Sequence, residues 1–266
     1  MTIDNYEEMN KSIVVIGSGN VACSIVPALK EAGYTILQVF SRSRMSAESL
    51  AYKVGASAVT QPEKVMATAD IYLYCLKDDV LSQLQNMHLP FTQGLHVHTS
   101  GTMSMSIFGQ LDCHQFGVLY PFMTFTKVRR IQMSKVPLFI EFNGRMAEIT
   151  LRDMAGAISD SVQTLTEDRR KALHIAGVFS NNFTNALLSM AENTLAEAGL
   201  NKNVLEPIMQ ETLVKYMSLG AREAQTGPAM RGDMNVVEQH INHLEADRDA
   251  QEVYLAITNY IINKIK

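Results

Sequence analysis

The chain has 266 residues, 47% of them hydrophobic, which is enough to bury the core of one large domain or two modest ones. Its formal net charge of −4 gives no general attraction to phosphate backbones, so we expect no nucleic-acid partner. No apolar run reaches the roughly eighteen residues of a membrane span, so we expect no membrane partner either. The polar start, Met1 to Asn10, lacks the pattern of a secretion signal. Three cysteines without CxxC spacing favour small apolar residues in a reducing cytoplasm over disulfides or a metal site.

The first half of the chain alternates short β-rich runs with helical stretches. Apolar runs typical of buried strands begin with Ser12 to Ile16 and Thr35 to Phe40. Further strands are expected at Ala56 to Val59, Ile71 to Leu76, Leu95 to His98, Phe116 to Leu119, Pro137 to Phe142 and Ser161 to Leu165. Helices are expected at Val21 to Ala32, at Ser46 to Lys53 with Ser46 as N-cap, and at Arg145 to Ile158. This alternation predicts a parallel sheet with helices on both faces.

After about residue 166 the pattern becomes purely helical. Long helices are expected at Asp168 to Leu200, with Gly199 as C-cap, at Val204 to Gln225 and at Asn235 to Lys264. We therefore predict an α/β protein with an N-terminal sheet domain of the Rossmann type, residues 1–166, followed by an all-α domain, residues 167–266.

A glycine-rich loop joins the first strand to the first helix. It reads Gly17-Ser18-Gly19-Asn20-Val21-Ala22, a G-x-G-x-x-A motif. The first glycine permits a tight turn, the second lets the backbone approach a pyrophosphate, and the small Ala22 lets helix and strand pack closely. Free N–H groups at the helix start then face the phosphates. The motif predicts dinucleotide binding; a glycine turn without a ligand is the alternative.

The end of the second strand selects the cofactor. Where an NAD enzyme normally has Asp or Glu, this chain reads Ser41-Arg42-Ser43-Arg44. A guanidinium flanked by hydroxyls suits the 2′-phosphate of NADP, so we predict NADP over NAD. Alternatively, Arg42 and Arg44 merely solvate a loop.

Two further segments follow strand ends, where ligands lie in open α/β sheets. Leu76 and Lys77 are expected to line the cofactor path. His98, Thr99 and Ser100 are expected beside the nicotinamide or substrate, with His96 packed below them. An H-x-H metal site has no carboxylate or cysteine ligand placed with it, so we expect no metal.

The first long helix of the second half carries His174, Asn181 and Asn185. At helical spacing these polar groups share one stripe of an otherwise apolar helix, where they need a partner or a ligand. Histidine suits the proton donor that hydride transfer to C=O or C=N requires. A satisfied interdomain histidine, with asparagines bonding the backbone, is the structural alternative.

A second cluster reads Thr226-Gly227-Pro228-Ala229-Met230-Arg231-Gly232-Asp233. Gly227 and Pro228 break the preceding helix, and Asp233 or Asn235 can cap the next. Arg231 and Asp233 either anchor an acidic substrate or pair with each other.

Together these motifs resemble the family that joins a Rossmann-like domain to a C-terminal domain of unknown function, DUF2520. The resemblance rests on Gly17 to Ala22, the Ser41-Arg42-Ser43 turn, His98 to Gly101, the helix of His174 and the segment Thr226 to Asp233. The group is similar in build to 6-phosphogluconate and β-hydroxyacid dehydrogenases, ketopantoate reductase and pyrroline-5-carboxylate reductase. It implies NAD(P)-linked chemistry in a cleft between the domains, a 6-phosphogluconate dehydrogenase-like helical domain and dimerisation through that domain. By resemblance, His174 stands near the catalytic lysine of β-hydroxyacid dehydrogenases.

We therefore expect an NADP-dependent oxidoreductase acting on a small carbonyl, hydroxyl or imine substrate. His174 would move the proton, Ser100 and Asn181 would polarise the reacting group, and Arg231 would hold a substrate anion, with His98, Asn185 and Asp233 in contact with substrate. The alternative is a non-catalytic NADP-binding sensor or regulatory protein.

Overall fold

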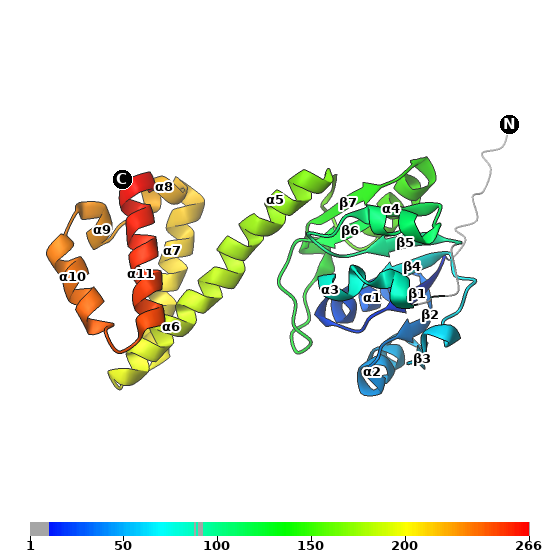
Figure 1. Ribbon diagram of the computed structural model, residues 1–266, viewed down its shortest axis with the longest axis horizontal. Helices are drawn as coiled ribbons and strands as arrows, with labels where there is room; N and C mark the ends of the chain where they lie inside the picture. Colours follow the sequence, from blue (N-terminus) through cyan, green and yellow to red (C-terminus); the bar gives the residue numbers. More distant parts are fainter. Residues whose placement is uncertain (1–10, 88, 90–92, 266) are drawn as a thin grey trace. The chain divides into compact units, whose positions relative to one another are not determined.

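The computed structural model describes residues 11–87, 89 and 93–265 (Figure 1). The polar segment Met1 to Asn10, expected to carry no secretion signal, lies outside the described residues. Contacts divide the chain into two compact units, Met1–Asn182 and Phe183–Lys266. The boundary that the sequence predicts after residue 166 instead marks the end of the strands, because the last strand ends at Thr164.

The first unit is built on one eight-stranded sheet. Its strands are β1 (Ser12–Ile16), β2 (Thr35–Phe40), β3 (Ser57–Val59), β4 (Ile71–Tyr74), β5 (Leu95–His98), β6 (Gln115–Pro121), β7 (Leu138–Phe142) and β8 (Val162–Thr164). They lie in the order β3-β2-β1-β4-β5-β6-β7-β8, which Figure 1 shows from β3 at the bottom of the sheet to β7 at its top. The reversal of direction beside β1 makes the gap between β1 and β4 the switch point at which such folds bind nucleotides.

One pair of strands departs from the predicted parallel arrangement. β7 runs antiparallel to β6, with Gly117 opposite Phe142 and Pro121 opposite Leu138. The connection between β6 and β7 contains only the short 3₁₀ turn Met133–Lys135 and no crossover helix, so the chain returns along the neighbouring strand. The sheet is therefore mixed, and an alternation of elements alone does not reveal such a reversal.

Both faces of the sheet are covered. On one face, α1 (Asn20–Glu31), α2 (Arg44–Val54) and α4 (Arg145–Gly156) bury the side chains of alternate strand residues such as Val15 and Leu73. On the other face, α3 (Asp78–Leu81) and short 3₁₀ turns pack on the intervening residues. These turns are Pro62–Lys64, Leu84–Met87, Met105–Ile107 and Gly109–Leu111. Strands covered on both sides explain the unbroken apolar runs of the sequence.

The end of this second face, over β6 and β7, is covered by α5 (Glu167–Gly177). Leu173 of α5 packs against Val118, Tyr120 and Phe139. This contact explains why α5 belongs to the first unit although it follows the last strand.

The caps and ends of several helices differ from prediction. Ser43, not Ser46, caps α2, and its hydroxyl accepts a hydrogen bond from the Ser46 backbone at 3.4 Å. The helix expected over 168–200 contains a π turn, Val178–Phe183, between α5 and α6 (Thr184–Glu197). Because a π turn adds one residue to the helical register, Asn181 and Asn185 are rotated off the α-helical stripe predicted to hold them with His174.

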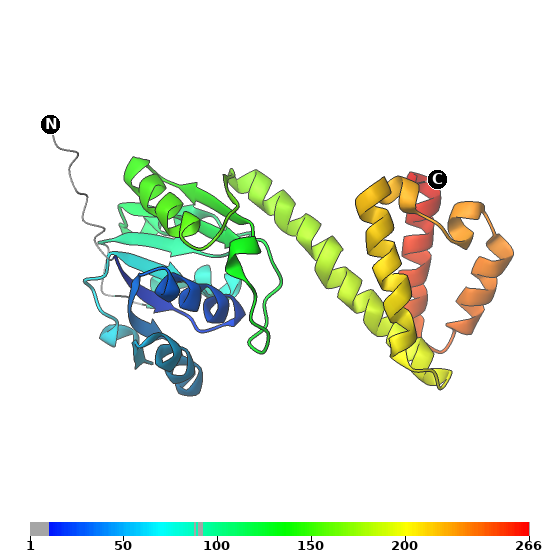
Figure 2. The same cartoon turned by 180° about the vertical axis from the view of Figure 1, so that it is seen from behind.

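The second unit is helical throughout its described residues. It contains α6, a 3₁₀ turn (Lys202–Leu205), α7 (Glu206–Leu219), α8 (Ala221–Ala224), α9 (Pro228–Arg231), α10 (Met234–His243), α11 (Arg248–Tyr260) and a π turn (Ile261–Ile265). Figure 2, like Figure 1, shows α11 between α7 and α10. Two predicted helices are each interrupted: the first at Gly220, where φ is +80°, and the second before Asp247, whose carboxylate caps α11.

The two units bury apolar residues very differently. Within the described part of the second unit, the buried apolar residues are Ala229, Val237 and Ala250. By contrast, α7 exposes Ile208, Leu213, Val214 and Met217, each by more than 60%. None of the described helices is long and apolar enough to span a membrane.

Candidate functional site

The phosphate loop begins where β1 ends, between β2 and β4. Gly17 adopts φ +111° and donates its N–H to the carbonyl of Phe40 at 2.8 Å. A Cβ atom at Gly17 would overlap the carbonyl oxygen of Cys75. Only glycine fits this turn, for reasons of both dihedral angle and space.

Helix α1 then starts without a side-chain cap. Its N-cap is Gly19, and no side chain of the described chain bonds the first N–H groups of the helix. These uncapped donors open onto a cavity of about 580 Å³. The cavity is lined by Gly17, Ser18, Gly19, Phe40, Ser41, Arg42, Ser43, Cys75, Leu76, Lys77, Asp79, Val80, Gln83, Asn86 and Met87. A pocket with free amide donors at a helix start fits a dinucleotide phosphate.

The turn after β2 lies on the wall of the same cavity. Arg44 is engaged in its own helix, where Nε pairs with Glu48 Oε1 at 2.7 Å, and the Ser43 hydroxyl caps that helix. Arg42 lines the cavity and carries no ion pair among the described residues. Of the two arginines named by the sequence, Arg42 is therefore the one available to a phosphate. The residues present fit NADP, since no carboxylate occupies the end of β2.

The loop after β5 is held by hydrogen bonds of its own. The Ser100 hydroxyl accepts from the backbone N–H groups of Thr102 at 3.1 Å and Met103 at 3.0 Å, and the Thr102 hydroxyl donates to Asp78. Thr99 is buried and its hydroxyl donates to the carbonyl of Tyr74 at 3.4 Å. Because the Thr102 hydroxyl gives its proton to Asp78, the Ser100 hydroxyl donates its own proton to the Thr102 oxygen, 3.5 Å away.

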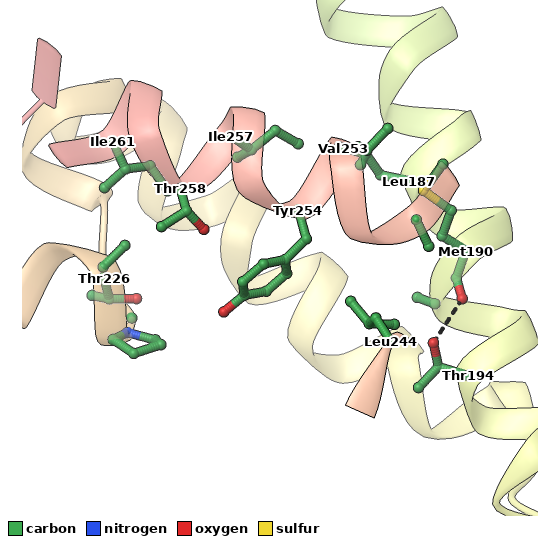
Figure 3. Close-up of a pocket in the computed structure, with 15 residues that line it drawn as sticks. Leu187, Met190, Thr194, Thr226, Leu244, Val253, Tyr254, Ile257, Thr258 and Ile261 are labelled. Atoms are coloured by element: carbon green, nitrogen blue, oxygen red, sulfur yellow. Dashed lines mark hydrogen bonds between the residues drawn. The ribbon is translucent and has the colours of Figure 1, made fainter. Parts of the chain in front are cut away.

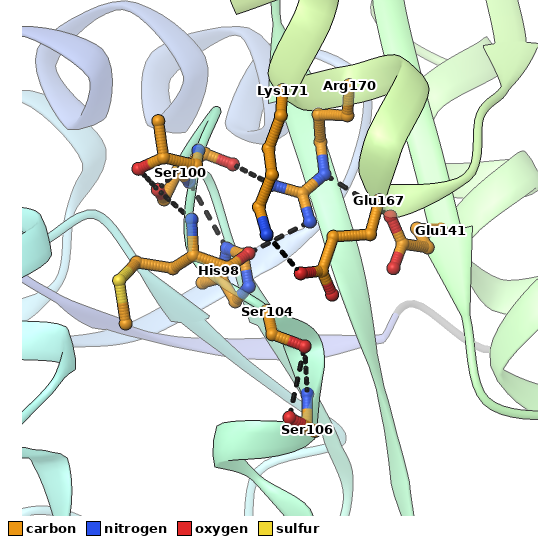
Figure 4. Close-up of polar contacts among 10 residues, drawn as sticks. His98, Ser100, Ser104, Ser106, Glu141, Glu167, Arg170 and Lys171 are labelled. Carbon is orange, nitrogen blue, oxygen red and sulfur yellow. Dashed lines mark hydrogen bonds and ion pairs between the residues drawn. The ribbon is translucent and has the colours of Figure 1, made fainter.

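Arg170 of α5 binds the backbone of this loop (Figure 4). Its guanidinium donates to the carbonyls of Ser100 at 3.0 Å and Met103 at 2.8 Å, and to Glu141 Oε2 on β7 at 3.3 Å. Arg170 is only 1% exposed. Burial raises the pKa of Glu141, an effect that the Arg170 charge opposes. A buried charge with all its partners in place fixes α5 against the loop.

His98 lies beneath the loop rather than at its surface. It is fully buried, and its Nδ1 accepts the backbone N–H of Ser100 at 3.2 Å. Burial, with a further contribution from the Arg170 charge, lowers the pKa of His98 to about 3. His96 is also buried, as expected, and bonds the Tyr74 hydroxyl at 3.0 Å; burial lowers its pKa to about 4. Both imidazoles are therefore neutral at physiological pH.

His174 lies against the same loop. Its Nδ1 is 3.0 Å from the hydroxyl of Tyr120, the penultimate residue of β6. A Cβ atom at Gly101 would come within 2.5 Å of that nitrogen, so the glycine makes room for the ring. The structure thus places His174 of α5 against Gly101, which follows Ser100 in the loop after β5.

The other predicted site residues are exposed on the helices and turns after α5. Asn181 is exposed in the π turn, and Asn185 is exposed in α6 of the second unit. Arg231 and Asp233 are also exposed and pair with each other at 3.4 Å, the second of the two alternatives for this cluster. Within the described part of the chain, no three His, Cys, Asp or Glu side chains are arranged to hold a metal ion.

The second unit has a pocket of its own (Figure 3). It has a volume of about 300 Å³ and lies between α6, α11 and the segment from Thr226 to Ala229. Its wall is mainly apolar, with Tyr254, Thr194 and Thr258 as the larger polar side chains. The Thr226-Gly227-Pro228-Ala229 sequence therefore lines one side of this pocket.

Three residues of the first site escape the sequence analysis: Tyr120, Glu141 and Arg170. Arg170 stands four residues before His174, on the same helical stripe, and that spacing was an available signal. Tyr120 shares a strand face with Val118, which pairs with His98. Only the sheet register, and not the sequence, shows that proximity.

Comparison with known proteins agrees with this architecture. Residues 136–261 match the model of the domain of unknown function DUF2520, and residues 12–89 match the family described as NADP oxidoreductase coenzyme F420-dependent. A protein of Bacteroides fragilis described as a putative NADP oxidoreductase has 34% sequence identity and a TM-score of 0.90, over 96% of this chain and 99% of that one. A search of curated proteins finds no match.

More distant structures share the fold. The imine reductase of Myxococcus stipitatus, solved with NADP⁺, has 16% identity and a TM-score of 0.66, with 94% of each chain covered. Pyrroline-5-carboxylate reductase of Coxiella burnetii has 16% identity and a TM-score of 0.56, over 96% of this chain and 97% of that one.

The mixed Rossmann sheet, the uncapped glycine loop and the helical second unit define a protein of the NADP-dependent oxidoreductase class. Within that class, the chain belongs to the DUF2520 family of NADP oxidoreductase-like proteins.

Proposed function

We propose that this protein is a cytoplasmic NADP-dependent oxidoreductase that transfers a hydride between NADP(H) and a small carbonyl, hydroxyl or imine substrate. The observation that supports the proposal is that His174 lies against Gly101, beside Ser100, in the loop that follows the carboxyl end of β5. The phosphate loop follows the carboxyl end of β1, which runs in the same direction as β4 and β5. The nicotinamide, when bound, supplies or accepts the hydride.

The cofactor would be held by the first unit. The backbone N–H groups from Ser18 to Val21 would bind the pyrophosphate at the start of α1, and Arg42 would bind the 2′-phosphate. Leu76 and Lys77 line the same cavity and would border the path toward Thr99.

The proton would be handled by His174. Its ring is partly exposed, unlike the buried rings of His96 and His98, and so it can reach a substrate. The Ser100 hydroxyl would exchange its long bond to Thr102 for one to the substrate oxygen or nitrogen, which it would polarise. The neutral, buried His98 has no access to substrate; we assign it the support of the Ser100 backbone in place of the substrate contact that the sequence suggested.

The helical unit would complete the site. Asn181 and Asn185 follow His174 along the chain and would bond the reacting group, while Arg231, with Asp233 beside it, would hold a substrate anion. A cleft between the two units would exclude water from the reaction.

The same unit would form a homodimer through α7. A helix that is apolar around most of its surface is normally buried, yet Ile208, Leu213, Val214 and Met217 are exposed. A second copy burying α7 would remove this apolar surface from water.

The first experiment is a fluorescence titration of the purified chain with NADPH and with NADH. We expect NADPH to bind at least tenfold more tightly, because Arg42 would contact the 2′-phosphate that NADH lacks. Equal affinity for the two would contradict the cofactor assignment, and no binding of either would contradict the whole proposal.

The second experiment is a screen of NADPH oxidation against small imines, keto acids and aldehydes. Imines come first, because the Myxococcus relative with this fold is an imine reductase. With any active substrate, His174→Ala should lower kcat about 10²- to 10⁴-fold at unchanged NADPH affinity. His114→Ala, at an exposed position, is the matched control. Binding of NADPH without turnover of any compound would favour a sensor.

A further inference from the structure

Tyr120 is the residue in contact with the inner nitrogen of His174. Its hydroxyl lies 3.0 Å from Nδ1, and the two rings meet edge to face with centroids 6.0 Å apart. Tyr120 is 8% exposed and sits at the end of β6, a strand paired on both sides. It therefore has a fixed position from which to orient the more exposed imidazole.

A hydroxyl group differs from other partners of histidine because it both donates and accepts. A carboxylate at this position would favour the imidazolium, and an amide N–H would favour neutral imidazole. We infer that Tyr120 is a positioning residue that holds the His174 ring in one orientation through both of its protonation states. This inference rests on the proposed function, in which His174 exchanges a proton.

The two states use the hydroxyl in opposite senses. When His174 is neutral, Tyr120 donates to Nδ1 and the ring proton resides on Nε2. When His174 is protonated, Nδ1–H donates to the Tyr120 oxygen. In either state Nε2 is the nitrogen left to face substrate, and no described residue bonds it.

This arrangement accounts for each bond that the proposed reaction makes and breaks. In the direction of reduction, bound NADPH would supply the hydride for the new substrate C–H bond from a C–H bond of its own and become NADP⁺. The Nε2–H bond of the His174 imidazolium breaks, and that proton forms an O–H or N–H bond on the substrate. His174 becomes neutral and solvent returns the proton. Tyr120 keeps its own proton throughout, since burial raises its pKa to about 12, an effect that the Arg170 charge partly opposes.

The charged side chains near Tyr120 and His174 form ion pairs with other residues. Arg170, four residues before His174 on α5, is paired with Glu141 on β7. Lys171, also on α5, pairs with Glu167 at 2.5 Å. Tyr120 is thus the direct polar partner of the His174 ring among the described residues.

The test is ¹⁵N NMR of the histidine-labelled full chain at a pH where imidazoles are neutral, comparing wild type with Tyr120→Phe. The His174 signals, assigned by their loss in His174→Gln, should report mainly the Nε2–H tautomer in wild type. In Tyr120→Phe they should shift to a mixture with Nδ1–H. Tyr52→Phe, at a 90% exposed tyrosine, is the control and should leave them unchanged.

A second variant keeps the inference testable if Tyr120→Phe does not fold. Gly101→Ala places a methyl group 2.5 Å from Nδ1 and should displace the ring without touching Tyr120, giving the same change of tautomer. With an active substrate, Tyr120→Phe should lower kcat about 10- to 100-fold at unchanged KM for NADPH. Unchanged His174 tautomer signals in Tyr120→Phe would overturn the inference. Because this readout needs no turnover, it is separate from failure of the proposed catalysis.

Discussion

The two units of this chain use their apolar residues in opposite ways. The sheet unit buries them on both faces, and its phosphate loop and the loop after β5 follow the carboxyl ends of parallel strands. The helical unit leaves most of its large apolar side chains exposed, above all along α7. The difference shows that the core of the chain lies mainly in the first unit, whereas the second leaves apolar surface that the proposed homodimer would bury.

The largest expected effect concerns the buried ion pair between Arg170 and Glu141 in the sheet unit. Arg170→Met should lower the free energy of unfolding by about 3–5 kcal/mol, because it leaves Glu141 buried and unpaired. Urea denaturation measures the change. The double variant Arg170→Met with Glu141→Leu should recover much of the loss. Arg145→Ala, which breaks an exposed ion pair, should cost less than about 1 kcal/mol. If Arg170→Met and Arg145→Ala lowered the free energy of unfolding equally, the stabilising role of the buried Arg170 would be contradicted.

The next effect tests whether the exposed apolar face of α7 forms an interface between two copies of the chain. Leu213→Asp on α7 should weaken self-association at least about 30-fold, equivalent to about 2 kcal/mol, by placing a charge in an apolar interface. Analytical ultracentrifugation over a range of concentrations measures it. Val128→Asp, at a 96% exposed position of the sheet unit, should have no effect. A wild-type chain that is monomeric at all concentrations would refute the contrast between the units.

A comparable effect is expected at the cofactor edge. Arg42→Ala should reduce the preference for NADPH over NADH by about 10- to 100-fold, the loss of one charge-assisted contact of about 1.5–3 kcal/mol. Arg44→Ala should change it much less, because Arg44 already pairs with Glu48. Fluorescence titration with both nucleotides distinguishes the two arginines, and an equal loss in both variants would argue against the assignment to Arg42.

Counted over a single pH unit, the smallest effect is the pH dependence of the stability of the sheet unit. Burial lowers the pKa of His96 to about 4 and of His98 to about 3, so below pH 6.5 the unfolded chain binds more protons than the folded one. Stability should therefore fall as the pH falls, by up to about 1.4 kcal/mol per histidine for each pH unit until the folded pKa is reached. Urea midpoints between pH 7 and pH 5 measure the slope. His98→Asn should flatten it, and His114→Ala should not.

Local sequence predicted much of the first unit. The bounds of β1, β2 and β5 agree with the apolar runs, and Gly17 and Gly19 occupy the turn and the helix start that the motif requires. Such features depend on residues close together along the chain. The antiparallel β7 and the interruptions at Gly220 and before Asp247 were missed, because a single turn residue overrides helical propensity and because strand direction leaves no local pattern.

The sequence by itself determined the class of fold, the phosphate loop and the arginine-containing turn after the second strand, since each is carried by contiguous residues. Only the tertiary structure decided that His98 is a buried neutral support, that His174 meets Tyr120, and that Arg170 joins α5 to β7 and the loop after β5. These partners are separated by 29 to 70 residues along the chain. The register of the sheet and the packing of α5, and not any local motif, bring them together.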